Sequence, residues 1–180
     1  MHAGSPLTSE ILTVLAALHA ANATAAPLPA VLVDVGAGSG LYTLIAAALG
    51  YPVIAFEADP RRVDAMYQTL CWNPDLRERV TLFPHAAVGA GRTCRIYANE
   101  HDLANWHGAG AQMVCEDGAP PAGTLRASAH SVRLGDYLEG AQADVLRIDA
   151  EGYEPRVLSG AGAATPPSSR VVHSARCRHA

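Results

Sequence analysis

The sequence predicts a doubly wound α/β domain built around a mostly parallel sheet. Three short, almost continuously apolar runs, at Ala30–Val35, Pro52–Glu57 and Asp144–Ile148, are typical of parallel strands that are covered on both faces. Two segments with helical spacing of apolar residues, Leu41–Leu49 and Pro60–Leu70, lie between these runs. Strands that alternate with helices favour one parallel sheet with helices on both of its faces.

Length and charge set the broad organisation of the chain. Its 180 residues are expected to form one domain with a substantial core. We expect an N-terminal helix and linker at 1–29, the main domain at 30–161, and an irregular tail at 162–180 in which only Arg170–His173 has the character of a strand. The net charge is −4, all basic residues are Arg, and they form no basic run, so a nucleic-acid surface is not indicated.

The segments between the apolar strands give weaker patterns. Val80–Phe83 is predicted to be a third strand, and Thr93–Ala98 a fourth, either at an edge or in an insertion. Residues 98–124 are rich in Gly and Pro and show no sustained period, which is typical of a functional or mobile loop. A brief strand and turn are expected at Ser131–Leu138, followed after the Asp144–Ile148 strand by a helix that begins at Glu154 and stops at Gly160.

The cysteines and the apolar N-terminal stretch indicate neither a disulfide framework nor a membrane span. The four cysteines are far apart and form no Cys-x-x-Cys pair, so reduced thiols, no zinc or other metal site, and a cytoplasmic location are expected; they are Cys71, Cys94, Cys115 and Cys177. The uncharged stretch 11–33 is interrupted by His19, Pro27 and Pro29, and Glu10 precedes it where a signal peptide would carry basic residues.

A glycine-rich turn follows the first apolar strand. The segment Asp34-Val35-Gly36-Ala37-Gly38-Ser39-Gly40 lies between a strand and a helix. Glycines allow a tight turn there and let a ligand approach backbone N–H groups at the start of the helix. A dinucleotide-binding turn would place a third glycine where this chain has Leu41, so the spacing disfavours a nicotinamide cofactor.

Carboxylates follow two further strands of the predicted sheet. Glu57 ends the second strand, where an acidic residue accepts hydrogen bonds from ribose hydroxyls. Asp149 and Glu151 follow the strand at 144–148, and they are candidates either for a general base or for capping of the next helix. Because ligands of open α/β sheets bind at the carboxyl ends of the strands, we expect these groups to line one crevice.

Four segments together resemble the FkbM-type family of S-adenosylmethionine-dependent methyltransferases. They are DVGAGSGLYTLIAAALG at 34–50, VIAFEADP at 53–60, SVRLGDYL at 131–138 and RIDAEGYEPRVLSGA at 147–161. The resemblance covers about residues 30–161 and depends on the order and spacing of the segments. It implies a Rossmann-like sheet of the class I methyltransferase type, shortened at its C-terminal end so that the last strands of that sheet are lacking.

The resemblance also implies roles for particular residues. The methionine and ribose side of an S-adenosyl-L-methionine pocket would be shaped by Asp34, Gly36, Gly38 and Gly40, and Glu57 would hold the ribose diol. Ala58, Asp59, Ala86 and Ala87 would lie near the adenine. Asp149 and Glu151 would face the methyl-transfer side as catalytic residues, with His107 of the long loop as a second candidate for the base.

The implied reaction is methyl transfer to a hydroxyl oxygen of a small molecule, sugar (glycan) or lipid. Two alternatives stay open: a non-catalytic or unstable fragment of a methyltransferase fold, which the atypical tail suggests, and an NAD-dependent oxidoreductase, which the glycine spacing disfavours. No metal is required by any of these interpretations.

Overall fold

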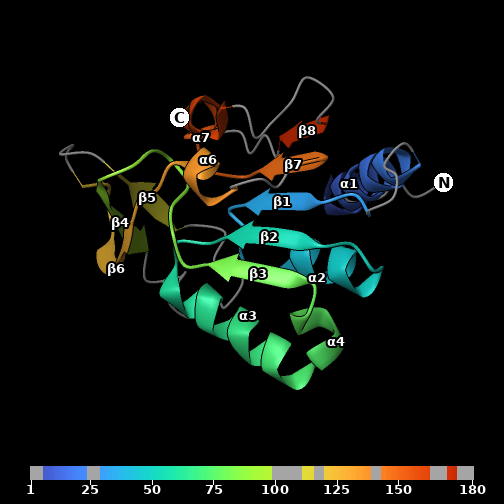
Figure 1. Cartoon of the computed structure of the whole chain (residues 1–180). Coiled ribbons are helices and arrows are strands. Elements are labelled where there is room, and N and C mark those ends of the chain that lie inside the picture. The colour runs from blue at the N-terminus through green and yellow to red at the C-terminus, as the bar shows by residue number, and fades with distance from the viewer. Residues whose placement is uncertain are drawn as a thin grey trace.

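A computed structural model of the chain describes residues 6–23, 29–98, 111–115, 120–138, 143–162 and 170–173 (Figure 1). The helices in this part of the chain are α1 (Pro6–Asn22), α2 (Leu41–Ala48), α3 (Pro60–Trp72), α4 (Pro74–Arg77), α6 (Leu134–Tyr137) and α7 (Glu154–Ala161). The strands are β1 (Leu32–Val35), β2 (Val53–Phe56), β3 (Val80–Phe83), β4 (Thr93–Ala98), β5 (Gln112–Val114), β6 (Thr124–His130), β7 (Val145–Ile148) and β8 (Arg170–His173).

The centre of the molecule is a parallel sheet with the strand order β3-β2-β1-β7-β8. The chain adds β2 and β3 on one side of β1, and β7 and β8 on the other side (Figure 1). The order therefore reverses between β1 and β7, which is the position where doubly wound sheets bind ligands. The predicted fold class is confirmed, and the three apolar runs form β1, β2 and β7.

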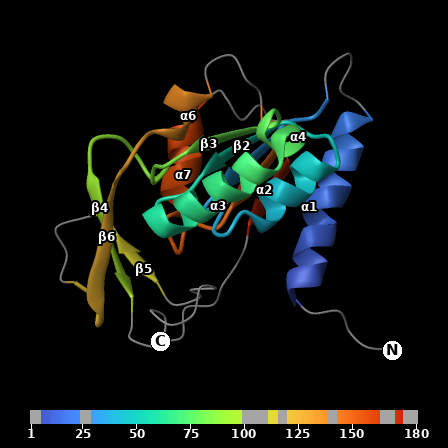
Figure 2. The same ribbon diagram turned by 90° about the horizontal axis from the view of Figure 1, so that it is seen from below.

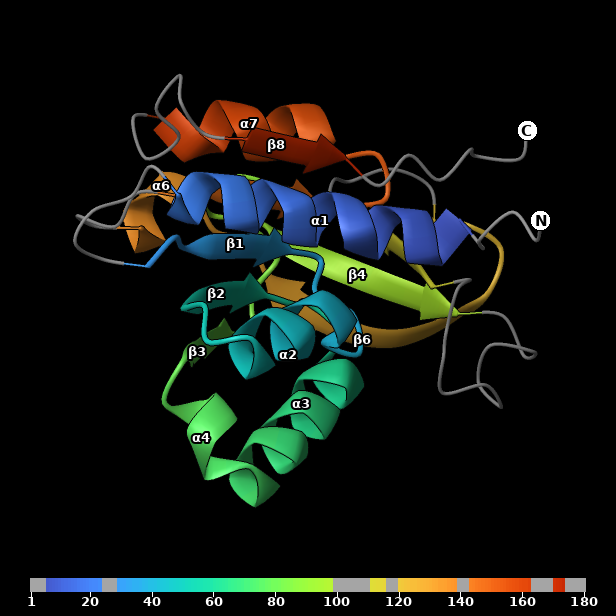
Figure 3. The same cartoon turned by 90° about the vertical axis from the view of Figure 1, so that its right-hand side faces the viewer.

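Both faces of the sheet are covered, which explains why its strands are apolar almost throughout. Alternate residues of β1 and β7 point to opposite faces: Leu32 and Val145 pack in one apolar cluster, whereas Val33 and Leu146 pack in the other. The first cluster includes residues of α1, α2 and α3, and Figure 3 shows these helices side by side. The second cluster includes residues of α6 and α7.

A small antiparallel sheet with the order β5-β4-β6 stands beside the carboxyl ends of the parallel strands (Figures 1 and 2). Thr93–Ala98 forms its central strand, so the predicted strand is confirmed. Of the two alternatives, the strand lies in an insertion and not at the edge of the parallel sheet. The strand expected at Ser131–Leu138 is wrong: the strand lies earlier, at Thr124–His130, and Leu134–Tyr137 is a helical turn. Most residues of 124–130 are polar or small, because much of β6 lies at the surface. The segment therefore shows little alternation of apolar and polar residues, which is the usual signal of a strand.

The end of the described chain contributes a strand to the parallel sheet. Arg170–His173, the one part of the expected irregular tail with strand character, forms β8 and pairs with β7 in parallel, with Leu146 opposite Val171. It therefore extends the sheet beyond β7. Helix α7 also runs past the predicted stop at Gly160 and ends at Ala161.

The expectation of reduced thiols is wrong for two of the cysteines. Cys94 and Cys115 form a disulfide, and Cys71 is an exposed free thiol. Antiparallel pairing of β4 with β5 places Arg95 opposite Val114, so the flanking Cys94 and Cys115 also come opposite each other. That register depends on a pairing across 21 residues, which spacing along the sequence does not reveal. In the portion described, no helix is both long and apolar enough to span a membrane.

The disulfide predicts a specific change in thiol count. Titration of the unfolded chain with a thiol reagent should find two more thiols after treatment with a reductant than before it. A Cys94→Ser, Cys115→Ser double variant serves as the control and should show no such increase. An unchanged count in the wild-type chain would contradict the pairing.

Candidate functional site

A pocket of about 310 Å³ lies at the carboxyl ends of the parallel strands, at the reversal of strand order. Four of the strands are followed by residues that line it: Gly36, Glu57 and Asp149 come directly after β1, β2 and β7, and His85 comes two residues after β3. The volume is within the range of small-molecule sites. Segments far apart in the sequence thus form one concave site, as the strand-end argument predicts.

The glycine turn between β1 and α2 forms one wall of the pocket. Gly36, Gly38 and Gly40 all have left-handed backbone angles, with φ of 76°, 63° and 87°. A Cβ atom on Gly36 would collide with the backbone carbonyl of Asp149, whereas a Cβ atom on Gly38 would meet nothing within 4 Å. Gly36 therefore allows β1 and β7 to approach closely, and Gly38 leaves open space on the pocket side.

Gly40 has a different function in the fold. It is the N-cap of α2, and a Cβ atom there would lie 2.7 Å from the sulfur of Met66 in α3. Gly40 and Asp34 are absent from the pocket lining, although both were predicted to shape it. Both residues lie outside the pocket lining and contact neighbouring elements instead: Gly40 lies against Met66, and Asp34 bonds Thr43 and Arg147.

Glu57 is buried at the end of β2 with its carboxylate in the pocket wall. Oε2 accepts a hydrogen bond of 2.7 Å from the Gly38 N–H, and Oε1 accepts one of 2.7 Å from the Asp59 N–H. Burial raises the pKa of Glu57 above its ordinary value, against the lowering effects of Arg62 and of these two donors. Each oxygen keeps a second lone pair with which it can accept a ligand hydroxyl.

The wall beyond Glu57 contains two buried polar atoms that have no hydrogen-bond partner within the described ranges. They are Oδ2 of Asp59 and Nδ1 of His85. Asp59 also caps α3, because its Oδ1 accepts a hydrogen bond from the Arg61 N–H at 3.0 Å, and its Oδ2 forms an ion pair with Nε of Arg126 at 3.8 Å. Burial lowers the pKa of His85, and nearby His130 lowers it further. Such unsatisfied groups in a pocket wall indicate a polar ligand.

Small residues complete this side of the pocket. Ala58 and Ala87 both line it, and the backbone after β3 is held to the small sheet by a hydrogen bond of 3.0 Å from Ala86 N–H to the His130 carbonyl. The small sheet adds Ile96 and Met113 to the lining. Small and apolar side chains therefore line this side of the pocket.

Arg147, in the middle of β7, is the residue that sequence reasoning left without a role. Its guanidinium donates to Asp34 Oδ1 at 2.8 Å, to Asp149 Oδ2 at 3.0 Å and to the Gly36 carbonyl at 3.2 Å. It also stacks 3.9 Å from the centre of the Tyr42 ring. Burial opposes the charge of Arg147, but the carboxylates of Asp34 and Asp149 outweigh burial and raise its pKa. The sequence did contain a signal for this role: an arginine inside a strand that is buried on both faces requires charged partners.

Asp34 is fully buried and bonds inward. Its second oxygen, Oδ2, accepts a hydrogen bond of 2.7 Å from the Thr43 hydroxyl of α2. Since β1 and β7 pair with Asp34 directly opposite Arg147, the register itself brings the two charges together. Asp34 therefore holds β1, β7 and α2 together and does not contact the pocket.

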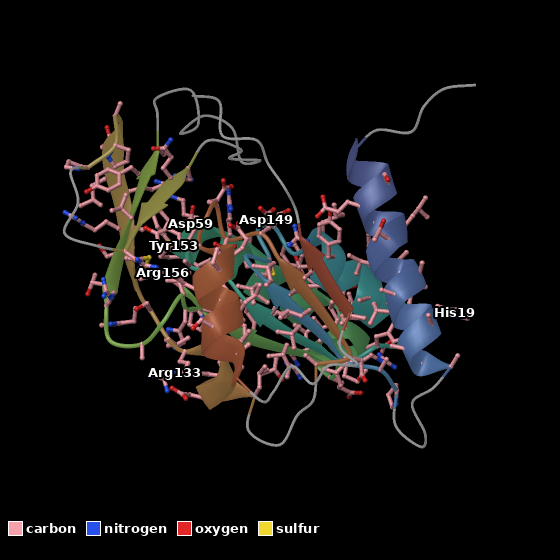
Figure 4. The ribbon with its side chains drawn as sticks, turned by 90° about the horizontal axis from the view of Figure 1, so that it is seen from above. His19, Asp59, Arg133, Asp149, Tyr153 and Arg156 are labelled. Carbon is pink, nitrogen blue, oxygen red and sulfur yellow. A yellow bond between two sulfur atoms is a disulfide. The ribbon has the colours of Figure 1, made fainter. Side chains whose placement is uncertain are left out.

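The two predicted catalytic carboxylates both line the pocket, just after β7. Figure 4 shows Asp149 beyond the end of the parallel strand that precedes it, on the side toward the small sheet. Glu151 has a φ of 51°, which is uncommon for a residue other than glycine. The N-cap of α7 is Tyr153, and Glu154 holds this turn by accepting hydrogen bonds from the N–H groups of Ala150 at 3.2 Å and Gly152 at 3.0 Å. Both carboxylates line the pocket, and the choice between a general base and a helix cap stays a prediction.

Of the predicted binding residues, the structure brings Gly36, Gly38, Glu57, Ala58 and Ala87 to the pocket. His107 and the rest of 99–110 lie outside the described residues. Among the residues that are described, no group of three or more His, Cys, Asp or Glu side chains is placed to hold a metal ion.

No protein-family model matches the sequence, and no curated protein matches it either. Solved structures do match. The glycopeptide N-methyltransferase MtfA complexed with (S)-adenosyl-L-methionine has a TM-score of 0.48 and 15% identity, over 88% of this chain and 52% of that chain. The methyltransferase FkbM from Methylobacillus flagellatus KT has a TM-score of 0.47 and 20% identity, over 77% of this chain and 31% of that chain.

A third match is the precorrin-6y C5,15-methyltransferase from Geobacter metallireducens GS-15, with a TM-score of 0.48 and 15% identity, over 96% of this chain and 66% of that chain. All three of these proteins are methyltransferases. Other structures of MtfA contain sinefungin or (S)-adenosyl-L-homocysteine. The chain spans about half the length of the MtfA chain in the complex with (S)-adenosyl-L-methionine.

The glycine turn allows a matched pair of substitutions. Gly36→Ala and Gly38→Ala both force alanine into a left-handed conformation, which costs about 1–2 kcal/mol. Only Gly36→Ala also pushes a methyl group against the Asp149 carbonyl, so its total cost should reach about 3 kcal/mol or more. Urea denaturation measures both free energies of unfolding, and equal losses would contradict the close approach of β1 and β7.

The raised pKa of Glu57 predicts how stability changes with pH. The folded chain retains a proton that the unfolded chain releases first, so the associated stability is present below the ordinary carboxyl pKa and is lost as pH rises through the folded-state pKa. The free energy of unfolding of the wild type, relative to Glu57→Gln, should therefore fall as the pH rises above about 4.3, the ordinary pKa of Glu. Denaturation at a series of pH values measures it; a difference that rises with pH would refute the assigned direction.

Proposed function

We propose that this chain is an S-adenosyl-L-methionine-dependent methyltransferase. One observation carries the proposal: the buried Glu57 carboxylate is bonded at 2.7 Å to the N–H of Gly38, in a glycine turn at the reversal of strand order. This arrangement offers a ribose diol two carboxylate oxygens and, beside them, open space above Gly38. The motifs at 34–50 and 147–161 support the same proposal.

The remaining walls fit the other parts of an adenosyl cofactor. Ala58 and Ala87 leave room for the adenine ring, and the unsatisfied Oδ2 of Asp59 and Nδ1 of His85 offer polar contacts on the same side. The turn at 36–40 and the region of Arg147 lie on the opposite side of Glu57, toward β7, and would take the methionine part. The cofactor, when bound, supplies an electrophilic methyl group on its sulfonium.

We propose a hydroxyl oxygen of a small molecule, glycan or lipid as the methyl acceptor. Asp149 and Glu151 line the pocket next to Arg147 and would face this acceptor. A carboxylate there accepts the hydroxyl proton, an effect worth about 10²–10⁴-fold in rate. The pocket walls orient the acceptor oxygen for in-line attack, and proximity of that kind contributes about 7–11 kcal/mol in well-aligned cases.

Calorimetric titration of the purified chain with S-adenosylhomocysteine tests the proposal. We expect saturable binding with a Kd on the order of micromolar and no binding of NAD. Glu57→Ala should weaken binding by about 100-fold, because it removes two hydrogen bonds to the ribose. Glu78→Ala, at an exposed position after α4, is the matched control and should bind like the wild type.

Circular dichroism and thermal melting of each protein accompany the titration. A well-folded wild-type chain that binds no S-adenosylhomocysteine would sink the proposal. Binding of NAD in its place would favour the oxidoreductase. A chain that melts without cooperativity and binds neither ligand would instead be a fragment of the fold.

A further inference from the structure

Helix α1 supplies a residue to the pocket, although residues 1–29 were expected to lie outside the main domain. Glu10 lines the pocket and places Oε1 3.4 Å from Arg147 Nε. Helix α1 packs on β7 and α2 at the same face of the sheet on which Asp34 and Arg147 lie. The first helix is therefore part of the site.

Glu10 is the third carboxylate around one guanidinium. Arg147 contacts Asp34 at 2.8 Å, Asp149 at 3.0 Å and Glu10 at 3.4 Å. The exposed fractions of the three acidic side chains are 0%, 11% and 22%. Glu10 thus makes the longest of these contacts and is the most exposed of the three carboxylates.

The electrostatics of this end of the pocket favour a cation. Three carboxylates and one guanidinium sum to a charge of −2, so a positive group entering the adjacent space is attracted. The pKa of Tyr42 is consistent with this negative charge. Burial and, after it, Glu10 raise that pKa to about 12, against the lowering effect of Arg147. By contrast, Arg62 lies near Glu57, on the ribose side.

The position of Glu10 relative to Glu57 identifies the part of the ligand that it faces. Glu57 follows β2, and the adenine side of the pocket extends from there toward β3. Glu10 and Arg147 lie on the other side, at β7 and α1. A ligand with its ribose at Glu57 and its adenine toward β3 therefore directs its remaining end toward Glu10.

We propose that Glu10 is a binding residue that recognises positive charge at the amino-acid end of the cofactor. This inference rests on the proposed function. Two groups of S-adenosylmethionine carry such a charge, the sulfonium and the α-ammonium. S-adenosylhomocysteine retains only the ammonium, and 5′-methylthioadenosine has neither group, so these three ligands separate the two sources.

The test is calorimetry of the full chain and two variants with each of the three ligands. Glu10→Gln removes the charge and keeps the size of the side chain, and Glu78→Gln is the matched exposed control. Glu10→Gln should weaken S-adenosylmethionine by about tenfold, the effect of losing one charge-assisted hydrogen bond, and should leave 5′-methylthioadenosine within about twofold. Glu78→Gln should change no affinity.

The response of S-adenosylhomocysteine identifies the charge. A loss similar to that of S-adenosylmethionine assigns Glu10 to the ammonium, and an unchanged affinity assigns it to the sulfonium; both outcomes support the proposal. Equal losses for all three ligands would show a structural effect and overturn it, as would no loss for any. If the wild-type chain binds none of the three, the proposed function fails first, and this inference fails with it.

Discussion

The buried guanidinium of Arg147 is the interaction on which the site depends. It joins the glycine turn, the strands β1 and β7, and helices α1 and α2 through its contacts with Gly36, Asp34, Asp149, Glu10 and Tyr42. Removing a partner from a buried ion cluster is costly, about 3–5 kcal/mol, because a charge is left without compensation. The same contacts that stabilise the fold therefore also fix the shape of the pocket at its β7 side.

Burial explains which parts of the fold were predictable from the sequence. The strands β1, β2 and β7 are covered on both faces, so their residues are continuously apolar and identify the sheet. The strand β6 has only part of its surface buried, and its residues Thr124–His130 carry no clear alternation. The pairing of Cys94 with Cys115 depends on the register of β4 with β5, which is a property of the folded sheet.

Some residues of the candidate site were likewise predictable from the sequence, and others were not. Gly36, Gly38 and Glu57 were predictable because their backbone angles and strand-end positions follow from local sequence. The inward orientation of Asp34 was not, because it is set by a partner 113 positions away. Glu10 gave no signal at all, since its place in the site depends on how α1 packs against the sheet.

The close contact of Gly36 with Asp149 has a consequence for how the pocket comes into existence. The strands β1 and β7 pair directly, yet more than a hundred residues separate Asp34 from Arg147 along the chain. Contacts between distant residues form only after the loop between them has been closed, at an entropic cost. During synthesis, the glycine turn and Glu57 leave the ribosome long before β7 does. The wall of the pocket that β7 contributes is therefore absent at that stage. A ligand that requires both walls can bind, and add its stabilisation to the fold, only once the segment around Asp149 has emerged and docked beside β1.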